Sequence, residues 1–200
     1  MADDDARRAE WEARYDAGRT GWDRGEASPA ARAWLAVGAI PRERVLVPGC
    51  GNGHEVIELA RHGCEVTAVD VARAPVEALR ARLADEGLRA EVVQADLLTW
   101  RPEQRFDAIY EQTCLCALDP IHRSAYELRL ATWLQPGGTL FALFMQTGEG
   151  GGPPFDCPIP AMRDLFEGDR WEWPEELGRI PHPNGFHEEA AALVRRAATA

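Results

Sequence analysis

A glycine-rich loop and an acidic residue follow two consecutive apolar runs near the start of the chain. The run 43–47 leads into the loop Gly49–Gly53, and the run 65–70 ends on Asp70, nineteen residues after Gly51. Glycines allow a backbone to approach a ligand closely, and a carboxylate at the end of the next strand can accept hydrogen bonds from ribose hydroxyls. This spacing predicts a site for a ligand that contains a nucleoside.

The spacing of the glycines indicates which nucleoside ligand the loop suits. Loops that bind a dinucleotide follow G-x-G-x-x-G, whereas this loop follows G-x-G-x-G and has His54 at the position of the third glycine. Glu55, near the start of the next predicted helix, would oppose phosphate charge. The pattern G-x-x-x-x-G-K-[ST] does not occur, because the chain contains no lysine. A ligand with a ribose and no phosphate fits better, and S-adenosylmethionine is such a ligand.

Further acidic and aromatic residues extend this interpretation. Asp96 ends the third predicted strand, where it can accept a hydrogen bond from the adenine amine while Leu97 packs beside the ring. The backbone of the glycine loop would meet the amino-acid portion of the ligand. A sulfonium is attracted to aromatic faces by about 0.5–2 kcal/mol. We therefore expect Trp11, Tyr15 and Trp22, which precede the sheet, to cover the site.

These residues need a sheet that brings the ends of its strands to one edge. The hydrophobic pattern predicts alternating strands and helices, which is typical of an α/β fold with a mostly parallel sheet and helices on both faces. Right-handed crossovers then place the carboxyl ends of the strands on one edge, where ligands bind. The predicted strands are 43–47, 65–70, 90–95, 106–111 and 139–145. The predicted helices are 5–17, Ser28-Pro29 to about Gly38, 54–62, 74–86, 121–134 closed by Pro136-Gly137-Gly138, 160–167 and a tail over 186–198.

A long glycine- and proline-rich loop, residues 147–160, follows the last of these strands. Loops longer than about 12 residues are usually functional or disordered. Since this one leaves the ligand edge of the sheet, it is a candidate lid. The hypothesis that an acceptor pocket lies between the Trp22 loop and residues 150–155 makes Trp22, Pro154 and Phe155 candidate acceptor contacts.

Composition and length favour a single domain over residues 1–200, with residues 1–40 as an N-terminal helical cap over the cofactor. A net charge of −11 without a basic cluster argues against nucleic acid as a partner. Five cysteines without zinc spacing indicate reduced thiols in the cytoplasm and no metal site. No apolar window of about 18 residues and no signal peptide occur, so no membrane partner is expected. We expect a monomer or weak dimer that acts on a small molecule.

Several motifs resemble those of the thiopurine S-methyltransferase family, which includes the plant halide and thiocyanate methyltransferases. The resemblance runs from Trp11 to about Pro160 and is most specific at Gly21-Trp22-Asp23-x-Gly25 and Gly152-Pro153-Pro154-Phe155. Its other parts are Trp11-x-x-x-Tyr15, Val47-Pro48-Gly49-Cys50-Gly51-x-Gly53-His54-Glu55, Val69-Asp70, Phe106-Asp107-x-Ile109-Tyr110-Glu111, Cys116-Ala117-Leu118-x-Pro120 and Leu134-x-Pro136-Gly137-Gly138. The resemblance implies a class I methyltransferase (Rossmann-like) fold, with S-adenosylmethionine as methyl donor and S-adenosylhomocysteine as product.

The resemblance also implies particular site residues, to which the loop itself adds Gly51. By position, the family's cofactor-binding residues fall on Trp11, Tyr15, Trp22, Gly49, Asp70, Asp96, Leu97 and Gln112. Two departures concern the acceptor. The mammalian thiopurine branch has arginine where Gln112 stands, and the plant branch has a tyrosine, linked to anion substrates, where Met145 stands. Met145 is therefore a candidate acceptor contact, and neither branch's substrate preference is carried over.

The resulting hypothesis is in-line transfer of a methyl group to the sulfur of a small thiol, thiopurine or hydrosulfide. A soft nucleophile needs little help from a base, so no catalytic residue is assigned. The possible bases, each of which we expect to be structural, are Glu111, Asp119, His122 and Asp156. Cys114 and Cys116 are expected to be packed inertly. Alternatives are a halide, metalloid, oxygen or nitrogen acceptor and, from another class, an NAD-dependent oxidoreductase or a non-catalytic protein that binds an adenosine ligand.

Overall fold

The strands and helices of the first half form close to where the sequence predicts them. The computed structural model describes residues 2–197, and the chain divides into two units, 1–101 and 102–200. The first unit contains α1 (Ala2–Asp16), α2 (Pro29–Ala36), β1 (Arg44–Pro48), α3 (His54–Arg61), β2 (Glu65–Asp70), α4 (Arg73–Asp85) and β3 (Glu91–Gln94). These strands are parallel and lie in the order β3-β2-β1.

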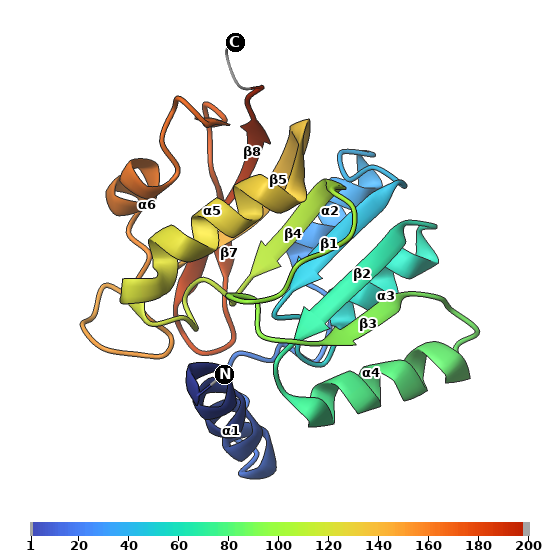
Figure 1. Ribbon diagram of the computed structural model, residues 1–200. Coiled ribbons are helices and arrows are strands. Elements are labelled where there is room, and N and C mark those ends of the chain that lie inside the picture. Colours follow the sequence, from blue (N-terminus) through green and yellow to red (C-terminus); the bar gives the residue numbers. More distant parts are fainter. Residues whose placement is uncertain (1, 198–200) are drawn as a thin grey trace. The chain divides into compact units, whose positions relative to one another are not determined.

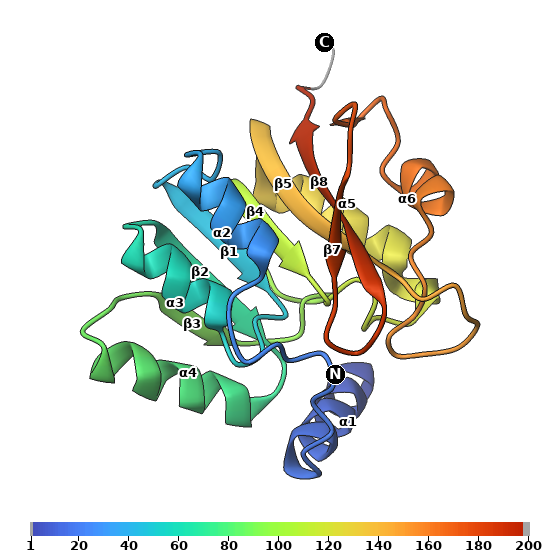
Figure 2. The same ribbon diagram turned by 180° about the vertical axis from the view of Figure 1, so that it is seen from behind.

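Local signals explain where the helices of the first unit begin. The Ser28 side chain caps α2 by accepting a hydrogen bond from Ala30 N at 3.3 Å, and Pro29 occupies the first turn. Helix α3 begins after Gly53, whose φ of 69° is readily adopted only by glycine. Helices α2 and α3 lie in front of β1 and β2 in Figure 2 and behind them in Figure 1. They therefore cover one face of this unit's sheet.

The second unit is built around one long central strand. It contains β4 (Phe106–Gln112), a short 3-10 helix η1 (Pro120–His122), α5 (Arg123–Trp133), β5 (Leu134–Gln146), α6 (Ile159–Leu165), β6 (Trp171–Glu172), β7 (Gly178–Pro181) and β8 (His187–Arg195). Strands β4 and β5 are parallel, whereas β8 is antiparallel to β5, β6 and β7. Figure 1 shows α5 in front of β5, so this helix covers one face of the unit's sheet.

The parallel pairs β1–β2, β2–β3 and β4–β5 confirm the predicted α/β class with a mostly parallel sheet and an N-terminal helix. The antiparallel strands at the end of the chain make the sheet a mixed one. Within residues 2–197, no helix is long and apolar enough to cross a membrane.

The prediction of a helical tail over 186–198 is wrong for residues 186–197. Residue 198 lies outside the described residues. His187–Arg195 forms β8, which is hydrogen-bonded to three other strands. Alanine and glutamate favour a helix locally, but pairing on both sides of the strand outweighs that propensity. Asn184-Gly185, a strong hairpin signal, precedes β8, and His182 N donates to Phe186 O at 3.0 Å to close the turn.

The helix before β5 ends at Trp133, close to the predicted residue 134, but the predicted start of the following strand at residue 139 is misplaced. Strand β5 already starts at Leu134, which pairs with Phe106, and pairing resumes with Thr139 opposite Ala108. The proline and glycines therefore lie in an irregular part of the strand. Such residues accommodate a bulge, so the motif interrupts the strand instead of preceding it.

Candidate functional site

Asp70, at the end of β2, holds the glycine loop that follows β1. Its Oδ2 accepts a hydrogen bond from Gly51 N at 2.8 Å, and its Oδ1 accepts one from Ala72 N at 2.9 Å. Burial raises the pKa of Asp70, and the N–H groups of Ala72, Gly51 and Val71 counter part of that rise. An ionised carboxylate has about four acceptor positions, so these contacts leave some capacity for a ribose hydroxyl. The residue thus has the geometry expected of a group that binds a nucleoside.

Three predicted aromatic residues gather over the glycine loop. The Trp22 ring packs edge-on against Trp11 and Tyr15 of α1, with centroid distances of 5.4 and 5.6 Å. A Cβ atom placed on Gly51 would lie 3.0 Å from the Tyr15 hydroxyl and 4.0 Å from Trp22 Nε1. Burial and the negative charge of Asp70 raise the pKa of Tyr15, so its hydroxyl is neutral. A side chain at position 51 would therefore crowd the Tyr15 hydroxyl, and the φ of 49° at Gly51 also favours glycine.

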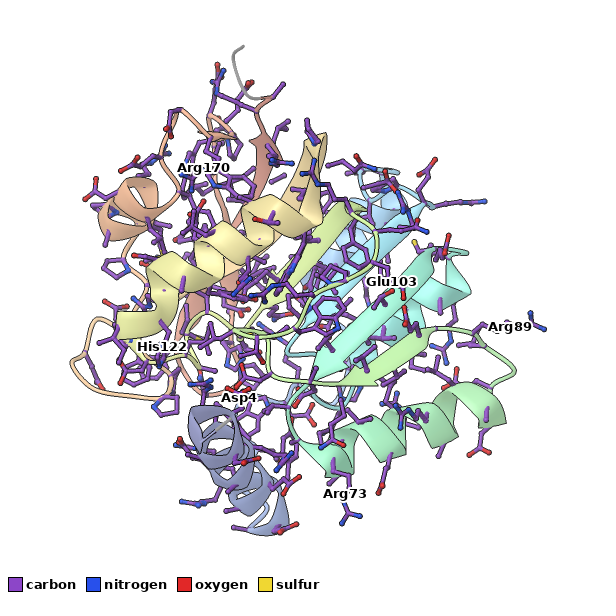
Figure 3. All side chains as sticks on the ribbon, viewed as in Figure 1. Asp4, Arg73, Arg89, Glu103, His122 and Arg170 are labelled. Carbon is purple, nitrogen blue, oxygen red and sulfur yellow. The ribbon has the colours of Figure 1, made fainter. Side chains whose placement is uncertain are left out.

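Asp96 is connected to α1 by contacts that the sequence analysis missed. Arg7 Nε donates to Asp96 Oδ2 at 2.6 Å, and Leu98 N donates to Oδ1 at 2.8 Å. Asp4, labelled in Figure 3 on the same helix, accepts a hydrogen bond from Thr99 Oγ1 at 3.1 Å. Helix α1 is therefore fastened to the segment that follows β3. The expected hydrogen bond from adenine to Asp96 would have to coexist with the Arg7 pair.

In the second unit, Gln112 is held between two other side chains. Tyr110 Oη donates to Gln112 Oε1 at 2.8 Å, and Gln112 Nε2 lies 3.2 and 3.1 Å from the two carboxylate oxygens of Glu188. Glu188 is 0% exposed and stands opposite Met145 in the pairing of β5 with β8. Directly paired residues of neighbouring strands share a face of the sheet. Gln112 and Met145 therefore both adjoin Glu188, a residue missed because its segment was expected to be helical.

The candidate base Glu111 is buried at the end of β4, and its burial alters its acidity. Its Oε1 accepts a hydrogen bond from Leu115 N at 2.7 Å, and among the described residues its buried Oε2 has no hydrogen-bond partner. Burial raises the pKa of Glu111 to about 7; the Leu115 N–H lowers it and the charge of Glu188 raises it further. A carboxyl group with such a pKa can hold or release a proton near neutral pH.

Thr113, directly after Gln112, has a strained backbone. Its φ of 59° lies in the left-handed region, and within residues 2–197 no other non-glycine residue has a positive φ. A β-branched residue in this conformation costs about 1–3 kcal/mol, and such strain concentrates at functional sites. The Thr113 hydroxyl donates to Gln112 O at 2.7 Å. The surrounding structure thus fixes the chain at the carboxyl end of β4.

Two of the other candidate bases, Asp119 and Asp156, accept hydrogen bonds from nearby backbone N–H groups. Asp119 caps η1 by accepting a hydrogen bond from Ile121 N at 3.0 Å, and Asp156 accepts one from Thr147 N at 2.8 Å. His122 is the last residue of η1. Cys114 and Cys116 are buried and form no disulfide, and the same holds for Cys50, Cys64 and Cys157. Burial raises the pKa of Cys116 well above its ordinary value, which favours the protonated thiol over the reactive thiolate.

The glycine- and proline-rich loop 147–160 is fastened at its second half. Phe155 N donates to Cys116 O at 2.7 Å, and Cys157 N donates to Met145 O at 2.8 Å. Gln146 Nε2 donates to Cys157 O at 2.6 Å. Because these bonds hold the end of the loop to β5 and to the segment after β4, any lid movement would be confined to its first half. The role of a lid stays a prediction.

The predicted site residues fall into two groups, one in each unit. The first unit brings together the aromatic residues, the glycine loop and the two strand-end acids: Trp11, Tyr15, Trp22, Gly49, Gly51, Asp70, Asp96 and the buried Leu97. The second unit contains Gln112, Met145, Pro154 and Phe155, of which Gln112 and Met145 adjoin the same glutamate.

Comparison with known proteins identifies the family. A family model described as thiopurine S-methyltransferase matches residues 6–178. The chain belongs to the thiopurine S-methyltransferase family. The "probable thiol methyltransferase 2" of Arabidopsis thaliana is 32% identical over 74% of this chain and 67% of the relative. The thiopurine S-methyltransferase of Pseudomonas putida (strain GB-1) is 29% identical over 93% of this chain and 95% of the relative.

A solved structure agrees with this family membership. The 1,6-didemethyltoxoflavin-N1-methyltransferase of Burkholderia thailandensis, solved with 1,6-didemethyltoxoflavin and S-adenosylhomocysteine, has a TM-score of 0.77 at 25% identity, covering 95% of this chain and 87% of that one. The fold is therefore that of a class I methyltransferase, and the chain is an S-adenosylmethionine-dependent methyltransferase. Family membership decides against the NAD-dependent alternative.

Proposed function

We propose that this enzyme methylates the sulfur of a small thiol, thiopurine or hydrosulfide, with the donor bound by the residues assembled around Gly51. The observation that carries the proposal is the joint position of Asp70 below the glycine loop and of Tyr15 and Trp22 above it. A carboxylate with free acceptor positions suits a ribose, and the aromatic rings suit a sulfonium. The names of the thiol and thiopurine methyltransferase relatives support sulfur as the acceptor atom.

The residues of the chain would mainly bind, orient and exclude water. S-adenosylmethionine, when bound, supplies a methyl group that is already activated by its sulfonium. In the transfer, an acceptor sulfur forms a bond to the methyl carbon while the carbon–sulfonium bond breaks, and the electron pair of that bond stays on S-adenosylhomocysteine. The acceptor thiol gives up its proton to solvent before or during attack. Positioning of this kind accounts for much of the rate in such a reaction.

The proposed donor contacts keep the roles that the sequence assigned to them. Asp70 would bind the ribose, the backbone of Gly49–Gly53 the amino-acid end, and Asp96 with Leu97 the adenine. Trp11, Tyr15 and Trp22 would cover the sulfonium. The residues that the sequence suggests as acceptor contacts remain Trp22, Met145, Pro154 and Phe155.

The test is a turnover screen with a donor that carries a labelled methyl group. Purified enzyme is incubated with thiols, a thiopurine, hydrosulfide, thiocyanate, iodide and a metalloid oxyanion, and labelled products are separated. The proposal expects the highest kcat/KM for a sulfur nucleophile. A preference for iodide, a metalloid or an oxygen or nitrogen centre would contradict the choice of acceptor but not the use of the donor.

Location and assembly are part of the same proposal. Five buried cysteines without a disulfide suit a reducing compartment, so we propose a cytoplasmic location for the enzyme. We expect a monomer or weak dimer, and light scattering at several protein concentrations measures this directly.

A further inference from the structure

The loop between α1 and α2, residues 17–28, is fastened to the first turn of α3 at two points. His54 Nε2 lies 2.9 Å from Asp23 Oδ1, in the middle of this cap loop. Glu55 Oε1 accepts a hydrogen bond from Ser28 N at 2.9 Å, at the end of the cap loop. Two consecutive residues of one helix turn therefore hold both parts of the loop.

Asp23 carries most of the contacts in this arrangement. Its Oδ1 also accepts a hydrogen bond from Gly25 N at 2.7 Å, and its Oδ2 accepts one from the Asn52 side chain. Burial pushes the pKa of Asp23 up, but the bonds from Gly25 and Asn52 and the nearby His54 together lower it. The carboxylate is therefore ionised at neutral pH and can accept strong hydrogen bonds.

One partner of Asp23, Asn52, belongs to the glycine loop and is itself held in place. Asn52 lies between Gly51 and Gly53, and its backbone oxygen accepts a hydrogen bond from Arg82 of α4 at 2.6 Å. The side chains of Asp23 and His54 are only 19% and 20% exposed. Partial burial and several bonds on one carboxylate distinguish this contact from an ordinary exposed ion pair, which is worth little.

Trp22 immediately precedes Asp23 and is the aromatic residue at the centre of the cluster over Gly51. Its ring contacts both Trp11 and Tyr15, and its Nε1 atom approaches the glycine loop. A bond that fixes the backbone one residue away also fixes the direction in which this ring points. The two anchors thus connect the position of Trp22 to the loop that it covers.

We propose that Asp23 and His54 are positioning residues that hold Trp22 over the glycine loop and thereby set the affinity for the methyl donor. The proposal rests on the proposed function, because the donor must bind at this loop. Neither residue needs to touch the donor; each acts through the cap loop. The Gly-Trp-Asp segment and the His54-Glu55 pair then serve one purpose, although they are separated by some thirty residues of sequence.

The test is calorimetric titration of S-adenosylhomocysteine into the full chain and its variants Asp23→Asn, His54→Gln and the double variant. Each single substitution is expected to weaken binding by about 5- to 30-fold, the effect of losing one charge-assisted hydrogen bond. The double variant should have a dissociation constant no more than about threefold above that of the single variant that binds more weakly. The reason is that both substitutions remove the same contact between Asp23 and His54. KM for the donor should rise by a similar factor while kcat changes less.

The matched control is His62→Gln, at the other end of α3, where His62 Nδ1 contacts Glu58 O at 2.9 Å. Its affinity for S-adenosylhomocysteine should equal that of the wild type. Hydrogen exchange supplies a second measurement: in His54→Gln, amides of residues 18–28 should exchange faster while those of β1 and β2 do not change.

Three outcomes would overturn this inference and leave the proposed function standing. They are unchanged affinity in both single variants, full additivity in the double variant, and an equal loss of affinity in His62→Gln. Failure of both single variants to fold would also overturn it, because the contact would then support the core instead of the cap loop. If the wild type does not bind S-adenosylhomocysteine at all, the proposed function falls together with the inference.

Discussion

Asp70 Oδ2 accepts the backbone N–H of Gly51 at 2.8 Å, so the acid that closes β2 also shapes the loop that follows β1. This relationship explains why a glycine loop and an acid nineteen residues later occur together in the sequence. The acid orients the loop with part of its hydrogen-bonding capacity, and under the proposed function the rest would bind the ribose of the donor. Its two roles lead to different measurable effects.

Replacing Asp70 by asparagine should weaken both roles. The amide has a single acceptor oxygen and no charge, so one of the two backbone N–H groups loses its partner. We expect affinity for S-adenosylhomocysteine to fall by more than about tenfold and the free energy of unfolding by about 1–3 kcal/mol. Calorimetric titration and urea unfolding measure the two effects. The control Asp85→Asn, at the exposed end of α4, should change neither, and equal affinity in the Asp70 variant would contradict the ribose-binding role.

Gly53→Ala tests how closely α4 packs against the glycine loop. Gly53 has a φ of 69°, and a Cβ atom there would overlap the fully buried Leu79 side chain. Gly63 has a φ of 83° with nothing within 4 Å of its Cβ position, so Gly63→Ala shows the effect of backbone strain alone. We expect Gly53→Ala to lose about 1–3 kcal/mol more in free energy of unfolding than Gly63→Ala. Equal losses would show that the packing at Leu79 yields easily.

The contact between Gln112 and Glu188 should appear as a coupling energy. In a double-mutant cycle, Gln112→Ala and Glu188→Ala are expected to couple by about 1 kcal/mol or more, because the amide donates to a fully buried carboxylate. Urea unfolding of the wild type, the two single variants and the double variant measures this coupling energy. The same cycle with Glu189→Ala, whose side chain instead contacts His187 at 3.4 Å, should give a value near zero. Coupling of equal size in both cycles would contradict a specific contact.

Glu111 should make stability depend on pH in a particular direction. Burial raises the pKa of Glu111 from its ordinary value of 4.5 to about 7, so over this window the folded state holds a proton that the unfolded state has released. The free energy of unfolding should therefore fall as pH rises from about 4.5 to about 7, by up to about 3 kcal/mol for this group. Glu111→Gln should remove that part of the slope.

Urea unfolding at several pH values across the window provides the measurement for Glu111. The exposed Glu149→Gln variant of the same unit should retain the wild-type slope. If Glu111→Gln and the wild type lose stability in parallel, the buried carboxyl does not hold a proton at neutral pH.

The features that could be predicted from the sequence depend on local patterns. The alternation of apolar strands with amphipathic helices predicts the first unit, and Ser28-Pro29 predicts the start of α2, because capping is decided by adjacent residues. Asp70 is predictable because a fixed spacing from the glycine loop follows from one strand–helix–strand step.

The features that could not be predicted depend on contacts between distant segments. Glu188 lies in an alanine-rich stretch whose helix propensity is overruled by pairing with three strands. The hydrogen bond from Arg7 to Asp96 joins residues 89 positions apart, and the contact between Asp23 and His54 joins residues 31 positions apart. No local sequence pattern predicts either contact. Asn184-Gly185 was a usable hairpin signal that indicated the missed strand β8.

A crystal structure with S-adenosylhomocysteine bound tests the central claim most directly. The account predicts the ribose hydroxyls within hydrogen-bonding distance of the Asp70 carboxylate and the amino-acid end against the backbone of Gly49–Gly53, beneath Trp22. A structure in which the ligand lies elsewhere, while Asp70 contacts only Gly51 and Ala72, would contradict it.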